Sequence, residues 1–255
     1  MLTDALVREL FQVMLVFARL GTALMLLPGF GEQYVLARQR LLLGLLLSAL
    51  VAPVVAGGLP SAPPADPGRL AGLLGGELLV GLFIGGVTRF AVAALHVAGT
   101  IVAMQSGLSA ASYFDPNEAG QGTLPGNLFT TTALVVMFAS DLHHVLLRAL
   151  AASYGRLPVA AGLPAGDALR LVLGLAGATM TTGLEVAAPL VVTALLTNLA
   201  LGILGRIVPA LQLLSLALPL QLLLALGLTL LAVAAAAAGF GHFLEGSLAF
   251  LDTGG

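Results

Sequence analysis

The sequence has 255 residues, of which 59% are hydrophobic and only 9% are charged, and its formal net charge is −2. Soluble domains carry about a quarter charged residues, so this composition excludes a water-soluble fold, and the slight negative charge offers no electrostatic attraction for nucleic acid. The absence of cysteine excludes disulfides, thiolate metal sites and thiol catalysis. We therefore predict an integral membrane protein.

Apolar runs, taken in chain order, predict an all-α membrane-type protein of about six long segments. The first run covers residues 5–27 and is stopped by Pro28 and Gly29, a pair that breaks helices. The second run covers residues 41–55 and ends before a connection rich in proline and glycine. The four remaining runs are 70–103, 128–152, 167–204 and 211–238.

Two runs, 70–103 and 167–204, are too long for one membrane crossing. At about 1.5 Å per residue each reaches roughly 50 Å, against a hydrocarbon core of about 30 Å. Folding both runs back as hairpins places the basic links on one side and the acidic loop and tail on the other. Both runs also contain residues of the kind that bend or break helices, namely Gly85, Gly86, Gly183 and Pro189. We therefore expect several bent or hairpin-like helices, which are tolerated where they are buried in protein or line a water-filled path.

Small residues in the run 70–103 predict close helix packing. In lipid, small residues let two helix backbones approach each other closely. The glycines that indicate such packing are Gly76, Gly81, Gly85 and Gly86.

Ionisable residues are conspicuous in so apolar a chain. A charge at the centre of a bilayer costs about 2.5–3.5 kcal/mol, so such side chains pair with each other or face a partner subunit. We predict buried charge at Arg19, Glu77, Arg89 and Glu185. Other ionisable residues in apolar segments are His96, Asp141, His143, His144, Arg148 and Arg206. Two interpretations stay open, a proton or ion path and contacts between helices or subunits, and we favour the second.

Residues 141–144 read Asp-Leu-His-His and form the nearest approach to a metal-binding motif. Asp141 and His144 share one helical face, but two ligands without a third convergent group fall short of a catalytic metal site. His143 lies about 100° away from His144 on a regular helix, so we expect that both cannot hold one ion.

No catalytic group is indicated either. A triad of Ser109, His96 and Asp115 can be assembled only on paper, because nothing in the spacing supports it and no Gly-x-Ser-x-Gly elbow occurs. The sequence thus predicts no catalytic residue, no cofactor and no metal, in a protein that is not an enzyme.

Three stretches together carry a likeness to one known family. Residues 104–127 read MQSGLSAASYFDPNEAGQGTLPGN, a small, polar, glycine-rich loop between two apolar runs. Residues 141–150 read DLHHVLLRAL, and residues 195–212 read LLTNLALGILGRIVPALQ. In order and spacing these stretches resemble the flagellar biosynthetic protein FliR family, a component of the type III export gate with a close relative in injectisomes. Leu142 and Ala210 depart from the residues usual at their positions.

The resemblance implies a non-enzymatic channel subunit of the flagellar type III protein export gate, built as one membrane domain over residues 1–255. It implies a mixed helical ring complex with FliP- and FliQ-family gate subunits, and further partners in the large export-gate protein and the FlhB-family switch subunit. Exported flagellar proteins would pass through unfolded, at the bacterial inner (cytoplasmic) membrane in the flagellar basal body. Two alternatives stay open, an injectisome type III secretion gate subunit and a secondary transporter with broken helices.

The resemblance also implies roles for particular residues. A plug loop at about 105–125 would close the channel, with large side chains filling an aqueous constriction. Its residues are Gln105, Gly107, Leu108, Ser109, Tyr113, Phe114, Asp115 and Pro116. The expected assembly and packing residues are Asp141, His143, His144, Asn198, Gly202, Arg206 and Pro209.

Overall fold

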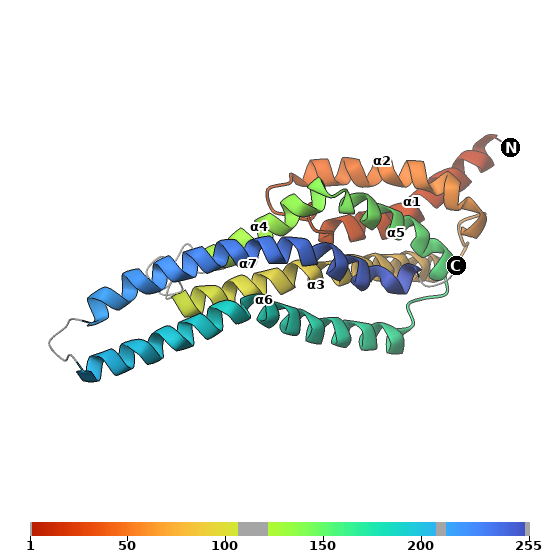
Figure 1. Ribbon diagram of the computed structural model, residues 1–255. Helices are drawn as coiled ribbons and strands as arrows, with labels where there is room; N and C mark the ends of the chain where they lie inside the picture. Colours follow the sequence, from red (N-terminus) through yellow and green to blue (C-terminus); the bar gives the residue numbers. More distant parts are fainter. Residues whose placement is uncertain (1, 107–121, 208–212, 253–255) are drawn as a thin grey trace. The chain divides into compact units, whose positions relative to one another are not determined.

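A computed structural model of the chain describes residues 2–106, 122–207 and 213–252. In these ranges the chain is helical and contains no β-strand, which confirms the all-α prediction (Figure 1). The elements are α1 (Leu2–Leu26), α2 (Ala37–Val55), the 3₁₀ turn η1 (Ala56–Gly58), α3 (Pro67–Ser106), α4 (Leu124–Ala139), α5 (Leu142–Arg156), α6 (Ala165–Ile207) and α7 (Leu213–Asp252).

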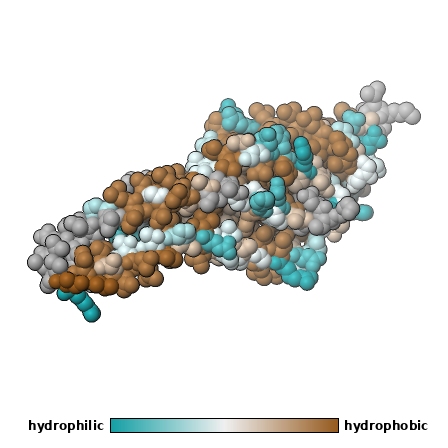
Figure 2. Space-filling view, viewed as in Figure 1, coloured by the Kyte–Doolittle hydropathy of each residue, from teal (hydrophilic) through white to brown (hydrophobic). Residues whose placement is uncertain are grey.

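The described helices have the length and apolarity of membrane spans. Four of them can cross a bilayer by these criteria, and the number rises to six when the pair α4–α5 and the bent part of α7 each count as one span. Figure 2 shows hydrophobic residues over much of the visible surface, as expected for helices that contact lipid or other subunits. The prediction of about six segments, several of them bent, is confirmed.

The expected hairpins are not formed. The helices α3 and α6 are continuous over 40 and 43 residues, and Pro189 lies inside α6. A glycine in a helix costs only about 1 kcal/mol relative to alanine, and proline is tolerated in apolar helices because neighbouring groups satisfy the freed backbone. The break occurs instead within the run 128–152, where Asp141 has a left-handed backbone (φ 57°) between α4 and α5.

The chain forms two compact units that share three helices. The first unit contains Met1–Phe90, Ser140–Leu175 and Leu244–Gly255, and the second contains Ala91–Ala139 and Ala176–Phe243. The long helices α3, α6 and α7 each contribute one part to each unit. The two units are described separately below.

In the first unit, α1 packs along α2 (Figure 1) and against the N-terminal part of α3. A Cβ atom added at Gly85 of α3 would lie 2.8 Å from both the carbonyl oxygen of Ala23 and the Cβ of Leu26. One added at Gly81 would collide with the backbone and side chains of α1. By contrast, a Cβ at Gly76 or Gly86 would meet nothing within 4 Å. Close packing is therefore confirmed at Gly81 and Gly85 and wrong at the other two glycines.

In the second unit, the C-terminal part of α3 packs against α4 and α6 through small residues. A Cβ at Gly99 of α3 would lie 2.7 Å from the backbone nitrogen of Gly126 in α4. A Cβ at Gly183 of α6 would lie 3.0 Å from the carbonyl oxygen of Ala94 in α3. These close approaches hold the helices together without large side chains.

The neighbouring residues Gly85 and Gly86 offer a matched test of helix packing. We expect Gly85→Leu to lower the thermal unfolding temperature of the purified chain strongly, because overpacking at a backbone contact costs typically 1–3 kcal/mol or more. Gly86→Leu is the control, since its side chain would enter open space. The measurement is the unfolding temperature in detergent, and equal losses in the two variants would contradict the packing described here.

Candidate functional site

The first unit contains a buried ion pair between α1 and α3. The side chain of Arg19 is fully buried and Glu77 is 2% exposed. Arg19 Nε donates to Glu77 Oε2 at 2.7 Å, and Arg19 Nη2 donates to Glu77 Oε1 at 3.0 Å. Two parallel bonds of this kind make the strongest arginine–carboxylate contact, so two of the predicted buried charges pair with each other inside the chain.

The same guanidinium also binds α5 and the chain that follows it. Arg19 Nη1 donates to Ser153 Oγ at 3.1 Å, and Nη2 donates to the carbonyl oxygen of Leu157 at 2.8 Å. The guanidinium carbon lies 4.1 Å from the centre of the Tyr154 ring, within the range of a cation–π contact. Arg19 thus joins three helices that are distant in sequence.

The other two predicted buried charges are placed differently. Arg89 is half-buried, donates from Nε to the carbonyl oxygen of Leu26 at 2.7 Å, and lies 3.5 Å from Glu32. This contact satisfies a free carbonyl at the C-terminal end of α1. Glu185 is exposed, and only 11% of the most apolar part of α6 is buried in the chain. The chain by itself buries Arg89 only in part and leaves Glu185 exposed, and the expected burial of these two charges against partner subunits stays a prediction.

Polar side chains of three helices gather in the second unit. A cavity of about 20 Å³ lies among α3, α6 and α7, and its volume suffices for one water molecule. Its polar lining is Gln105, Ser106, Thr193, Thr197 and Gln221. We call these five residues the polar cluster.

One hydrogen bond beside the polar cluster joins two helices. Gln221 Nε2 of α7 donates to Asn198 Oδ1 of α6 at 2.8 Å. Three residues of this region were not predicted from the sequence, namely Thr193, Thr197 and Gln221. The available signal was the spacing of the two threonines, four residues apart and therefore on one face of α6.

His96 has a packing role in the second unit. Its Nδ1 lies 3.4 Å from Thr130 Oγ1 of α4. Its ring also lies against Gly122, which has φ +83°, and a Cβ there would come within 3.0 Å of His96 Cε1. The ring therefore holds the start of α4 in place. Ser109 and Asp115, the other members of the rejected triad, lie outside the described residues.

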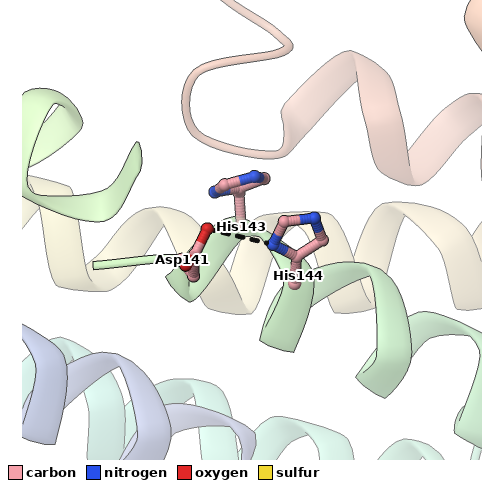
Figure 3. Close-up of side chains that lie close together, drawn as sticks. All are labelled: Asp141, His143 and His144. Carbon is pink, nitrogen blue, oxygen red and sulfur yellow. Dashed lines mark ion pairs between the residues drawn. The ribbon is translucent and has the colours of Figure 1, made fainter. Parts of the chain in front are cut away.

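At the start of α5, Asp141, His143 and His144 lie close together (Figure 3). One ligand atom from each lies within 4.8 Å of the others. His144 Nδ1 is 3.3 Å from Asp141 Oδ1, and the two imidazole rings are 4.0 Å apart at their centres. The two rings lie closer together than ideal helical spacing suggests, because side-chain torsions bring together rings that leave the helix in different directions. That both cannot serve one ion without unwinding of the helix stays a prediction.

The remaining predicted site residues divide into exposed and undescribed ones. Gln105 lies in the last turn of α3 and is exposed. Asn198, Gly202 and Arg206 are exposed on α6, and Arg148 is exposed on α5. Outside the described residues lie Gly107, Leu108, Ser109, Tyr113, Phe114, Asp115, Pro116 and Pro209.

The fold and the buried ion pair define a polytopic helical membrane protein. Residues 10–247 match the family described as "Bacterial export proteins, family 1". The chain belongs to this family.

The chain is similar in sequence to proteins of two kinds, flagellar biosynthetic proteins and a Yop translocation protein. The chain is 36% identical over 209 residues to "Flagellar biosynthetic protein FliR" of Caulobacter vibrioides, covering 82% of this chain and 83% of the relative. It is 29% identical over 202 residues to the protein of the same name in Bacillus subtilis, covering 78% and 77%. It is also 30% identical over 224 residues to "Yop proteins translocation protein T" of Yersinia pestis, covering 85% and 84%. The predicted family is confirmed.

Proposed function

We propose that this chain is a non-enzymatic channel subunit of a flagellar type III protein export gate, located in the bacterial inner membrane at the flagellar basal body. The observation that carries the proposal is the 36% identity to a flagellar biosynthetic protein over four-fifths of both chains. A second candidate, an injectisome gate subunit, is supported by the 30% identity to a Yop translocation protein. The higher identity favours the flagellar function.

Partner subunits are supported by the surface of α6. Its exposed apolar residues include Leu195, Leu199 and Ile203. Apolar residues alone are compatible with lipid, but Glu185 on the same helix is exposed too. A carboxylate facing hydrocarbon is costly, so this helix favours a protein neighbour that can pair with it. We infer that FliP- and FliQ-family gate subunits are these neighbours.

The polar cluster supports contact of the second unit with water or with another subunit. Polar side chains at membrane depth are tolerated where they line water or protein, and the cluster joins three otherwise apolar helices. The predicted plug loop continues directly from Gln105 at the end of α3. We infer that exported flagellar proteins pass in unfolded form through a channel that this chain forms together with its partner subunits.

Deleting the gene for this chain in its own bacterium tests the function. We expect cells without filaments, and no hook or filament protein in the culture medium, with both restored by a plasmid copy. The measurement is immunoblotting of the medium together with electron microscopy of cells, and an empty plasmid is the control. Normal filaments in the deleted strain would overturn the flagellar proposal, and loss of a separate secretion system's effectors alone would favour the injectisome candidate.

A further inference from the structure

The break between α4 and α5 places three metal-ligating side chains together. Asp141 precedes α5 with φ 57° and ψ 15°, a left-handed conformation that residues other than glycine adopt infrequently. Its backbone carbonyl accepts the amide N–H of His144 at 2.9 Å, so the helix begins immediately after it. The left-handed residue thereby turns the Asp141 side chain back toward the first turn of α5 (Figure 3).

The Asp141 carboxylate is not used as a helix cap. An aspartate at this position usually accepts hydrogen bonds from the first free amides of the helix, yet Asp141 makes no such bond. Its Oδ1 lies 3.3 Å from Nδ1 of His144 instead. The carboxylate is thus directed at the imidazole of His144, although an aspartate at this position usually accepts hydrogen bonds from backbone amides.

The spacing of the three groups fits a transition-metal ion. With bonds of 2.0–2.1 Å, a tetrahedral zinc ion holds its ligand atoms about 3.3 Å apart, which is the separation of Asp141 Oδ1 and His144 Nδ1. One ligand atom from each of the three residues, His143 included, lies within 4.8 Å of the others. Binding of one ion would require a change in the side-chain torsions of His143 that brings its nitrogen closer to the other two ligand atoms.

We propose that Asp141, His143 and His144 bind one divalent transition-metal ion, with Zn²⁺ as the reference ion. Two imidazole nitrogens and one carboxylate oxygen suit zinc, cobalt or nickel rather than magnesium or calcium, which prefer oxygen ligands alone. The side chains of Asp141 and His144 are 78% and 55% exposed, so an ion can enter from outside the chain. A fourth position stays open for water or for a residue of a neighbouring subunit.

Metal binding would stabilise the start of α5. A bound ion links the left-handed residue to the first helical turn and stabilises the state that binds it by mass action. The competing explanation is a simple imidazole–carboxylate contact between Asp141 and His144, which needs no metal. Binding affinity distinguishes the two, because only the metal site requires His143 as well.

The test uses the full chain in detergent, purified through a tag without histidine and stripped with EDTA. We expect Zn²⁺, titrated against a chromophoric chelator, to bind with one equivalent at micromolar affinity or tighter, and Co²⁺ to give the visible absorption of a four- or five-coordinate ion. His143→Ala, His144→Ala and Asp141→Asn should each weaken Zn²⁺ binding about tenfold or more, since even outer-shell changes cost about that much. His242→Ala is the matched control, because His242 is exposed and outside the cluster.

Stability separates a lost ligand from a lost fold. Asp141 and His144 are exposed, so their variants should unfold at the wild-type temperature when EDTA is present. Added Zn²⁺ should raise the unfolding temperature of the wild-type chain and of His242→Ala, but not of His144→Ala. Zn²⁺ binding that is absent from the wild type, or unchanged in any one of His143→Ala, His144→Ala and Asp141→Asn, would overturn the site.

Discussion

Glu77→Ala is expected to prevent the chain from accumulating as a stable protein, because it leaves the fully buried Arg19 without its carboxylate. Removing one partner of a buried ion pair costs about 3–5 kcal/mol, a large part of the 5–15 kcal/mol that stabilises a typical domain. Ser153 and Leu157 would still accept hydrogen bonds from Arg19, but neither carries a charge. The measurement is the yield of monodisperse protein in detergent and its thermal unfolding temperature.

A double variant makes this expectation sharper. Replacing both partners with apolar residues of similar volume is often neutral or stabilising, so Arg19→Met with Glu77→Leu should recover much of the stability that Glu77→Ala loses. Glu185→Ala is the control, since this carboxylate is exposed in the chain. If the double variant is as unstable as Glu77→Ala, or if Glu185→Ala is equally harmful, unpaired charge is not the cause.

Deleting residues 107–118 is expected to leave the gate assembled but permeable to small ions. Tyr113 and Phe114 are the only aromatic residues of this segment, and large side chains close an aqueous constriction by filling it and excluding water. Cells that express the deleted gate should leak ions and grow slowly. The measurement is the ion flux across the membrane together with the growth rate.

The control for the plug is the intact gate, compared at equal abundance of assembled complex. A second variant, Tyr113→Ala with Phe114→Ala, keeps the length of the loop and should leak to an intermediate degree. Unchanged ion flux in the deleted gate at equal assembly would show that the segment is an ordinary loop rather than a plug.

The helices were predictable from the sequence because long apolar runs indicate membrane helices and proline–glycine pairs mark where such helices end. The run 5–27 corresponds closely to α1, and 41–55 lies within α2. Breaks were not predictable in the same way. Gly85 lies in an uninterrupted helix because it packs against α1, and no local signal distinguishes such a glycine from one that bends a helix.

The sequence showed that buried charges need partners, but it did not show which residues pair. Hydropathy marks Arg19 and Glu77 as charges that need partners, but 58 residues separate them, and their pairing follows from how α1 and α3 pack. Glu185 was not predicted to be exposed in the chain, because an apolar run does not reveal which face of α6 its own chain leaves uncovered. The cluster of Asp141, His143 and His144 depends on the left-handed backbone of Asp141, which cannot be predicted from ideal helical spacing.

The buried arginine has a consequence for how the chain is made. Arg19 lies 58 residues before Glu77 and 134 residues before Ser153, so it leaves the ribosome long before its partners. At about 5–20 residues per second, synthesis of that interval takes roughly 7–27 s. During this time a charge of α1 at the centre of the bilayer is unpaired, at a cost of about 2.5–3.5 kcal/mol. We therefore expect the first helix to become stable in the membrane only once α3 and α5 supply the partners of Arg19.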